Sequence, residues 1–289
     1  MNMPVTISRV ADYQEQTGWE ALLELSFVQK PSTHSTRTVI GKSYHYGPLR
    51  VQRAFYPEGS LAHIYILHPP GGVVGGDFLD INFQVEKHAQ VLSTTPGSGK
   101  FYLSAGNWAK LTQTLTVKPD ASLEWLPQEN ILFCGARLHS RTRIECQDNA
   151  VFIGWDISCL GRPSSGEQFT QGAFDARLEF YHNDTLLFIE NQRVLNKQTL
   201  DAIAGLRGMP MQASLLAFPC NMTHLETVQK QLEIHESDLI SATLIDGLLV
   251  VRVLGDSSEL IKQQLIQIWQ VLRPMMLKRF AVLPRIWAT

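Results

Sequence analysis

One stretch of ten residues limits what this chain can fold into. Residues 68–77 read His-Pro-Pro-Gly-Gly-Val-Val-Gly-Gly-Asp. Prolines and glycines at this density exclude a regular helix and the middle of a sheet, because proline lacks an N–H donor and glycine weakens both structures. Paired glycines also permit positive φ angles and a close approach of the backbone to its neighbours. The stretch therefore predicts an elaborate turn that packs tightly against other parts of the chain.

Strand patterns flank this turn on both sides. In residues 78–85 apolar and polar side chains alternate, which is the period of a half-buried strand. Similar short runs, separated by turn residues, fill most of the chain up to residue 189. They lie at 19–28, 37–46, 49–55, 61–67, 78–85, 88–95, 111–117, 122–126, 137–146, 151–157, 174–181 and 185–189. This pattern predicts a mainly β fold of many short strands in stacked or sandwiched sheets, rather than alternating strand–helix units. We find no repeat of fixed period.

The C-terminal third has a different pattern. Residues 223–226 (Thr-His-Leu-Glu) match a capping box, and apolar residues at helical spacing follow them. Asp246-Gly247 predicts a hairpin turn between strands at 240–245 and 248–254. A second helix is predicted after residues 256–259, with Pro274 as its boundary. We therefore expect two α-helices in this third. Because no linker is visible, we expect a single domain over residues 1–289.

Composition narrows the class of protein. Apolar residues make up 44% and charged residues 18% of the 289 residues, which allows a substantial core. The net charge of −2 gives no reason to expect a nucleic-acid or membrane partner. Residues 1–6 lack the pattern of a signal peptide, and no stretch approaches the roughly 20 apolar residues of a membrane span. The four cysteines form no C-x-x-C pair. We expect a soluble, cytoplasmic protein.

Familiar catalytic motifs are incomplete or missing. Residues 96–100 (Pro-Gly-Ser-Gly-Lys) suggest a P-loop, but Thr94 stands where its first glycine belongs and Phe101 where its Ser or Thr belongs. There is no H-E-x-x-H and no G-x-S-x-G. His68 and His88 lie near the central turn and could contact a metal, although a lone histidine more often makes an ordinary hydrogen bond. We therefore name no catalytic residue and expect no permanently bound cofactor.

Basic residues alternate along one predicted strand. Arg137, His139, Arg141 and Arg143 would share one face, either as a docking surface for an acidic partner or as an ordinary solvated face. The solvated face is the commoner arrangement.

Three carboxylates stand beside apolar residues or glycine. They are Asp77 at the end of the central turn, Asp156 in a run of residues 151–157, and Glu190 after residues 186–189. A buried carboxylate costs several kcal/mol unless it is paired, hydrated or bound to a cation. The sequence leaves two interpretations open: ion pairs, for which Arg162 and Arg193 are near in sequence, or acids that face a water-filled space.

Several blocks of the sequence resemble one known family. The stretch 68–77 is followed by residues 92–102, by residues 123–128, by Gly161-Arg162-Pro163 with Gly166-Glu167, and by residues 282–287. In this order they resemble the urease accessory protein UreD family, which is called UreH in some organisms. One departure is that many members carry Gln-Ala-Ala-Thr where this chain has Pro-Gly-Ser-Gly at 96–99. That difference affects the expected shape of one loop.

The resemblance implies a non-enzymatic scaffold. Members of the family dock on apo-urease, a partner UreF bridges them to the GTPase UreG, and nickel is thought to pass through the scaffold to the enzyme. Asp77, Asp156 and Glu190 would then form a transient Ni²⁺ conduit in an internal tunnel, because a cation in transit should be bound weakly at several points. Ile286 and Trp287 are large apolar residues near the end of the chain, and we expect them to dock a partner such as UreF.

A rival interpretation is a β-rich hydrolase or carbohydrate-binding protein that uses an Asp/Glu pair. Such an enzyme needs two carboxyl groups about 5 to 10 Å apart in an open cleft. The sequence alone does not give that separation.

Overall fold

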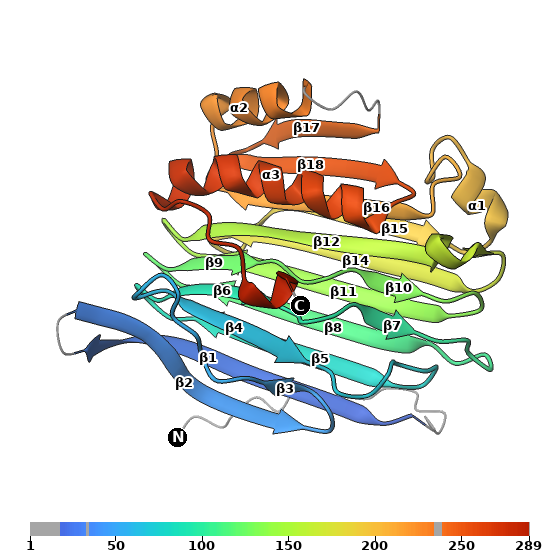
Figure 1. The fold of residues 1–289 in the computed structure, drawn as a ribbon, viewed down its shortest axis with the longest axis horizontal. Helices are drawn as coiled ribbons and strands as arrows, with labels where there is room; N and C mark the ends of the chain where they lie inside the picture. The colour runs from blue at the N-terminus through green and yellow to red at the C-terminus, as the bar shows by residue number, and fades with distance from the viewer. Residues whose placement is uncertain (1–17, 33–34, 234–238, 289) are drawn as a thin grey trace, which may run out of the picture.

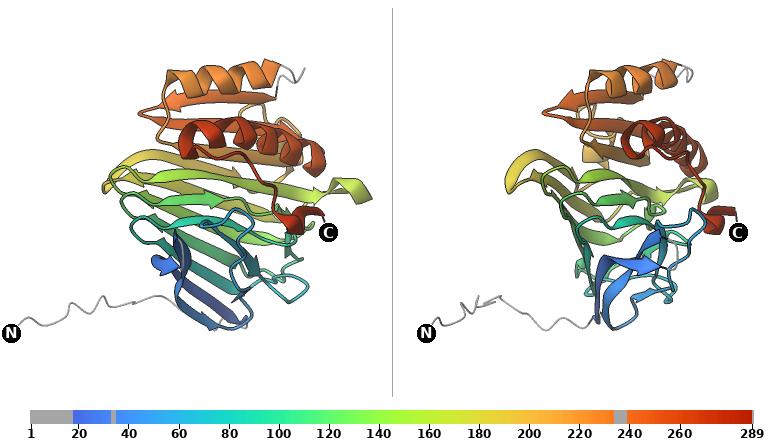
Figure 2. Two further views of the ribbon diagram at one scale, coloured as in Figure 1. Left: turned by 60° about the vertical axis from the view of Figure 1, so that its left-hand side comes forward. Right: turned by 90° about the vertical axis from the view of Figure 1, so that its left-hand side faces the viewer.

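A computed structural model describes residues 18–32, 35–233 and 239–288. It confirms the prediction of a mainly β fold of stacked sheets with two helices in the C-terminal third. Within these ranges the strands form a seven-stranded and an eleven-stranded sheet that face each other, and two helices cover the outer face of the larger sheet (Figure 1; Figure 2). Residues 1–6, which carry the expectation about a signal peptide, lie outside the described ranges.

The smaller sheet has the order β15-β14-β11-β8-β5-β1-β2. Its strands are β1 (Glu20–Ser32), β2 (Ser35–Tyr46), β5 (Phe78–Val85), β8 (Ala109–Val117), β11 (Arg137–Cys146), β14 (Ala173–His182) and β15 (Thr185–Val194).

The larger sheet has the order β17-β18-β16-β12-β9-β6-β4-β3, with β7, β10 and β13 attached beside this path. Its strands are β3 (Arg50–Val51), β4 (Ala62–Leu67), β6 (Gln90–Thr94), β7 (Gly99–Phe101), β9 (Ser122–Trp125), β10 (Asn130–Leu132), β12 (Val151–Arg162), β13 (Glu167–Gln168), β16 (Met211–Phe218), β17 (Ile240–Ile245) and β18 (Leu248–Gly255). The α-helices are α1 (Lys197–Asp201), α2 (Met222–Glu233) and α3 (Ser258–Leu277), and 3₁₀ helices span Pro163–Ser165 and Arg285–Ala288.

The chain winds between the two sheets as a solenoid. Strands β5, β8, β11 and β14 pair in parallel in the smaller sheet, and β4, β6, β9 and β12 pair in parallel in the larger one. Along the chain the strands of the two sets alternate, with β7, β10 and β13 in the connections from the larger sheet to the smaller one, so every circuit adds one strand to each sheet. Strands β7, β10 and β12 form a third, short parallel ladder.

Successive circuits turn the same corner in the same way. The N–H groups of Ala89, Ala121 and Ala150 each donate to the carbonyl three residues earlier. These alanines are spaced roughly 30 residues apart, and each lies at the connection from the smaller to the larger sheet. The sequence shows no repeat of fixed period. The structure shows that a degenerate repeat does exist at these corners, where few positions are fixed because only the turn shape recurs.

The central turn is the first rung of the short ladder. Val73 forms a parallel bridge with Phe101, and its N–H donates to the carbonyl of Lys100 at 2.7 Å. A Cβ at Gly72 would lie 2.8 Å from that carbonyl oxygen, and Gly76 has a φ of 101°. Gly72 is therefore required by close packing and Gly76 by its positive φ, as the sequence predicted for this turn.

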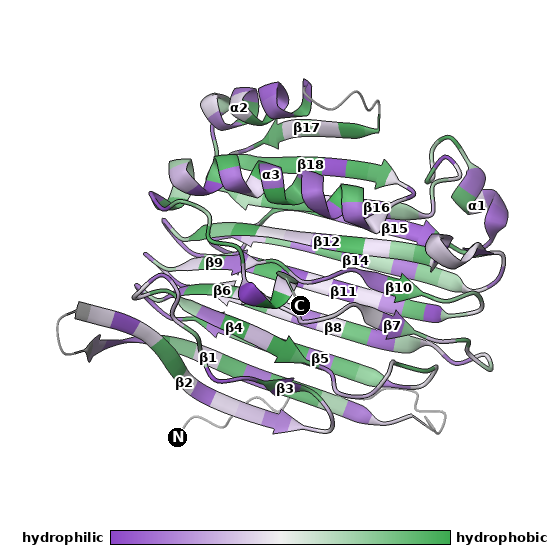
Figure 3. Cartoon of the chain, in the orientation of Figure 1, coloured by the Kyte–Doolittle hydropathy of each residue, from purple (hydrophilic) through white to green (hydrophobic). Residues whose placement is uncertain are grey.

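Two apolar clusters hold the layers together. The larger cluster fills the space between the two sheets, and the smaller one lies between the larger sheet and helices α2 and α3. Figure 3 shows apolar and polar residues interleaved along the strands. Along β5 the buried positions are Leu79, Ile81, Phe83 and Val85, as the alternation predicted.

Several predicted boundaries were wrong. The strand predicted at 49–55 is reduced to Arg50–Val51, and β16 was missed, because its eight consecutive buried residues show no alternation. Asn221, not Thr223, caps α2 by accepting the N–H of His224 at 3.3 Å. Pro274 lies inside α3 rather than at its boundary. The hairpin of β17 and β18 around Asp246-Gly247 is confirmed.

No helix in the ranges described is long and apolar enough to cross a membrane.

Candidate functional site

A row of polar side chains crosses the interior between the two sheets. These side chains occupy inward-facing strand positions where apolar residues are the rule. In the smaller sheet Gln113 pairs with Thr142, and its amide donates to the Thr142 hydroxyl at 3.0 Å. In the larger sheet Asp156 lies opposite Ser214, which lies opposite Arg252. The full set comprises Gln113, Ser140, Thr142, Asp156, Ser158, Glu190, Gln192, Gln212 and Ser214.

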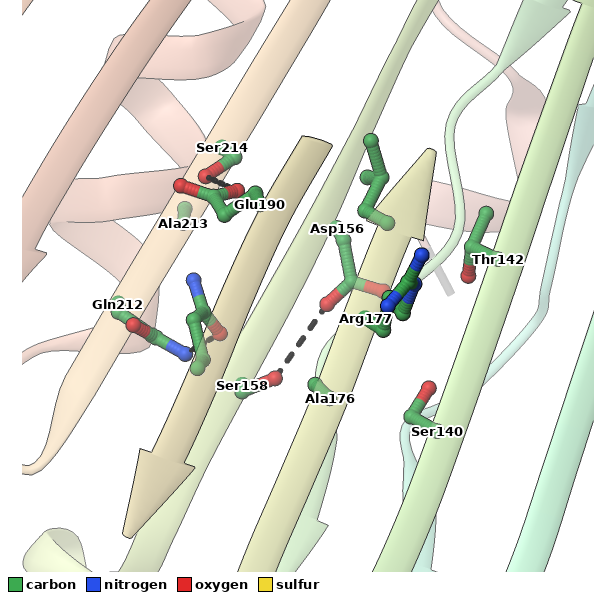
Figure 4. Close-up of a pocket in the computed structure, with 12 residues that line it drawn as sticks. Ser140, Thr142, Asp156, Ser158, Ala176, Arg177, Glu190, Gln212, Ala213 and Ser214 are labelled. Atoms are coloured by element: carbon green, nitrogen blue, oxygen red, sulfur yellow. Dashed lines mark hydrogen bonds between the residues drawn. The ribbon is translucent and has the colours of Figure 1, made fainter. Parts of the chain in front are cut away.

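Asp156 has one weak partner in this row. The hydroxyl of Ser158 donates to its Oδ1 at 3.3 Å (Figure 4). Burial raises the pKa of Asp156 from 3.8 to about 6; the Ser158 hydrogen bond lowers it and the nearby charge of Glu190 raises it further. At neutral pH Asp156 is therefore a charged acid whose charge is poorly compensated by the protein.

The Glu190 carboxylate has stronger partners than that of Asp156. Its carboxylate accepts a hydrogen bond from the Ser214 hydroxyl at 2.8 Å and one from the Arg252 guanidinium at 2.6 Å. The Glu190 side chain is 10% exposed, whereas that of Arg252 is 52% exposed. Glu190 therefore lies where the interior meets solvent. Arg193, the partner suggested by sequence proximity, pairs with Asp175 instead.

The two acids connect three cavities. A small polar cavity of about 20 Å³, enough for one or two water molecules, is lined by both Asp156 and Glu190 (Figure 4). Asp156 also lines a cavity of about 460 Å³ beneath the central turn. Glu190 also lines a cavity of about 560 Å³ at the edge strand β15, beside Arg252. The order is therefore edge cavity, Glu190, small cavity, Asp156, large interior cavity.

Asp77 is placed differently from the other two acids. Its Oδ1 accepts the N–H of Trp19 at 3.2 Å, and its Oδ2 accepts the N–H of Val74 at 2.9 Å. Its residue is 3% exposed, and it is not among the residues that line the three cavities. Asp77 thus holds the central turn against the segment before β1, and the structure does not bring it together with Asp156 and Glu190.

Ile286 and Trp287 lie in the C-terminal 3₁₀ helix. The Trp287 indole N–H donates to the Thr94 hydroxyl at 2.9 Å, and the ring lies 5.9 Å from that of Trp155. Both residues are half-buried against their own chain. The neighbouring Phe280, Val282 and Leu283 are exposed, with Phe280 at 86%.

The alternating basic strand is β11, on the outer face of the smaller sheet. Arg141 and Arg143 pair with Asp175 and Glu145, at 3.1 and 2.5 Å, and His139 stacks on Trp108. These pairings are those of a solvated outer face with its own counter-charges. Among the described residues no three His, Cys, Asp or Glu side chains gather as a metal site.

The polar residues that accompany the acids were not predicted from the sequence. Ser140, Thr142, Ser158, Gln212 and Ser214 come from three different strands, and only the strand pairing brings them together. The available signal was a polar residue at an inward position of an alternating strand, as at Gln113 between Leu111 and Leu115.

Comparisons with known proteins agree with the resemblance in sequence. The profile of the UreD urease accessory protein family matches residues 20–288. A urease accessory protein UreD of Alcanivorax borkumensis is 48% identical over 273 residues, covering 94% of this chain and 93% of its own. UreD proteins of Escherichia coli and Pseudomonas putida are 42% and 40% identical, with 94% and 97% of this chain covered and 98% of each relative. Urease accessory proteins are assembly factors and not catalysts, which removes the hydrolase alternative. The chain belongs to the UreD family of urease accessory proteins, and its role is in urease maturation.

Proposed function

We propose that this chain docks on apo-urease and, together with UreF and UreG, supports the insertion of nickel, with Ni²⁺ passing through its interior past Glu190 and Asp156. Nickel is the cargo in this proposal, and no cofactor remains bound. The observation that supports it is the sharing of these two acids by consecutive cavities. Two acids at the junctions of three cavities can pass a cation from one to the next.

The chemistry of the passage suits a cation that must leave again. Each acid offers one carboxylate. Apart from the Arg252 guanidinium on Glu190, the hydrogen-bond partners of the two acids are neutral hydroxyl groups, Ser214 for Glu190 and Ser158 for Asp156. A closed ligand cage would hold the metal, whereas isolated oxygen ligands bind weakly and allow exchange with water. A cation near Asp156 also favours its charged form, which offsets the effect of burial on its pKa.

The small cavity is the narrow point of the route. With about 20 Å³ it holds one or two water molecules, so a hydrated ion passes only if side chains such as Gln192 and Gln212 move apart. These two amides hydrogen bond to each other across the gap between the sheets. We infer that this pair opens when nickel passes.

Partner assignments are part of the same proposal. The incomplete P-loop, with Thr94 and Phe101 in place of its first glycine and its Ser or Thr, fits a division of labour in which UreG is the GTPase. Ile286 and Trp287 would contribute to docking UreF through the short helix that they form and the exposed apolar residues before it, Phe280, Val282 and Leu283.

The test measures complex formation and urease nickel content on the same samples. The variants are Asp156→Asn, Glu190→Gln and Asp77→Asn, with Asp256→Asn, an exposed acid, as the control. For Asp156→Asn and Glu190→Gln we expect normal assembly with UreF, UreG and apo-urease and about tenfold slower nickel loading, since a loss of about 1.4 kcal/mol of net attraction has that effect.

Asp77→Asn separates guidance of nickel from support of the turn. Asparagine retains only one acceptor oxygen for the two N–H groups that Asp77 now satisfies. A role in guiding nickel predicts intact assembly with slow loading, whereas a purely structural role predicts loss of stability and of assembly. Full nickel loading in all three assembled variants would refute the conduit.

A further inference from the structure

The cavity of about 460 Å³ contains one feature that the carboxylate route does not use. Its walls are mainly apolar, and the central turn closes one end. Asp156 lies among its lining residues, and so does His68, the first residue of the turn. The other polar side chains in the wall are hydroxyls, neutral amides and one lysine: Thr95, Ser98, Lys100, Gln113, Gln128 and Asn130.

His68 is held in position by stacking and not by hydrogen bonds. Its ring lies 6.1 Å from the Trp19 indole at an angle of 28°. In the described part of the chain no hydrogen bond to the His68 imidazole is found. Burial lowers the pKa of His68, partly opposed by the charge of Asp77. At neutral pH the ring is therefore uncharged, and it carries a nitrogen lone pair that the protein does not use.

We propose that His68 is a nickel ligand in this cavity and the residue that makes the passage selective for a transition metal. The inference rests on the proposed function and names a group that would discriminate between cations. Carboxylate, hydroxyl and amide oxygens suit Mg²⁺ and Ca²⁺ as well as Ni²⁺, whereas imidazole suits Ni²⁺ and other late first-row metals. Within the described part of the chain, His68 is the one histidine among the residues that line the three cavities.

The position of His68 suits a ligand near an exit. It directly follows strand β4, which ends at Leu67, and the glycine-rich backbone after it forms part of the cavity wall. Asp77 lies below this turn and contributes a negative charge that His68 senses. A cation that leaves Asp156 therefore finds a neutral nitrogen ligand at the central turn, with a carboxylate nearby to offset its charge.

The test uses the full-length chain purified with UreF and titrated with Ni²⁺ alone, then with Ni²⁺ in an excess of Mg²⁺. His68→Phe keeps a ring against Trp19 but removes the nitrogen, and His68→Gln tests the same loss with a polar side chain. His88→Asn is the matched control, because His88 is exposed, lies outside the three cavities and has a φ of 64°, which asparagine tolerates.

We expect both His68 variants to bind nickel about tenfold more weakly or worse, since even the loss of a group that only orients a metal ligand costs ten- to a hundredfold. We also expect Mg²⁺ to inhibit their nickel loading of urease at lower concentrations than it does for the wild type. His88→Asn should match the wild type in both measurements.

The outcomes separate this inference from the conduit itself. If Asp156→Asn slows nickel loading while both His68 variants bind and load nickel like His88→Asn, the conduit stands and the role of His68 is refuted. If neither Asp156→Asn nor Glu190→Gln slows loading, the conduit fails and the His68 proposal fails with it. A melting temperature for each variant identifies any that is merely unstable, and the second substitution at position 68 then decides.

Discussion

Replacing Asp156 by asparagine should make the protein more stable while it impairs nickel delivery. Asparagine keeps the size of the side chain and removes a charge that the interior compensates poorly. Burial raises the pKa of this acid from 3.8 to about 6. At about 1.4 kcal/mol per pKa unit, the charged form costs the folded state about 3 kcal/mol. The side chain borders cavities that can hold water, so we expect a gain of about 1–3 kcal/mol.

The sign of the stability difference between Asp156→Asn and the wild type, and the pH range in which it changes, follow from the direction of the pKa shift of Asp156. Because the pKa is higher in the folded state, the folded protein binds this proton more tightly than the unfolded chain does. The stabilisation from the protonated form is fully present below about pH 3.8 and is lost as the pH rises through about 6. The difference between Asp156→Asn and the wild type should therefore be small near pH 4 and reach its full size above about pH 6.5.

The assay is chemical denaturation of wild type, Asp156→Asn and the control Asp256→Asn across pH 4 to 8. Asp256 lies at the surface, so its replacement should change stability by no more than about 0.5 kcal/mol at any pH. A difference for Asp156→Asn that is constant with pH, or a loss of stability at pH 7.5, would show that the carboxylate is satisfied in a way that the described contacts do not include.

Two further predictions concern other parts of the chain. Arg273→Met should destabilise the protein by about 3–5 kcal/mol, measured by denaturation, because buried Glu124 would lose its ion-pair partner and Glu58 would keep only His63. Deletion of residues 282–289 should weaken capture of UreF in a pull-down; Trp287→Ala, which removes packing worth about 1–3 kcal/mol, is the control for loss of stability alone. Unchanged capture by the deletion, at an unchanged melting temperature, would leave the segment without a docking role.

The sequence predicted those elements that follow from local pattern. Alternation in β5 and the Asp-Gly turn of the β17–β18 hairpin depend on neighbouring residues, and both were predicted correctly. The parallel winding was not predicted, because it depends on which distant strands pair. Even the recurring corners at Ala89, Ala121 and Ala150 differ in most of their residues. Strand β16 was not predicted because it is buried on both faces, so its sequence lacks the alternation of apolar and polar residues that indicates a strand.

In the candidate site, too, the sequence predicted what depends on neighbouring residues but not what depends on distant contacts. Asp77, Asp156 and Glu190 looked alike in sequence, since each stands beside apolar residues or glycine. Their surroundings in space differ: Asp77 accepts two backbone N–H groups, Glu190 pairs with Arg252, and Asp156 has one weak hydroxyl partner. Which partner each acid meets depends on contacts between segments up to 62 residues apart, as for Glu190 and Arg252. The sequence therefore indicated which acids were unusual but not how each is used.

A comparison with Glu124, another buried acid of this chain, shows how unusual the surroundings of Asp156 are. Both acids lie in the larger sheet, and burial raises the pKa of each. Glu124 is fully buried, yet it accepts hydrogen bonds from Arg273 at 2.8 and 3.0 Å and from the Trp269 indole at 2.6 Å. This is how a structural acid is accommodated, because its partners replace the lost water. Asp156 has no such ion pair within the residues that the structure describes, where the Ser158 hydroxyl is its side-chain partner. An acid without an ion-pair partner at the junction of two cavities lowers stability, and in the proposed conduit a passing cation would supply the missing charge compensation.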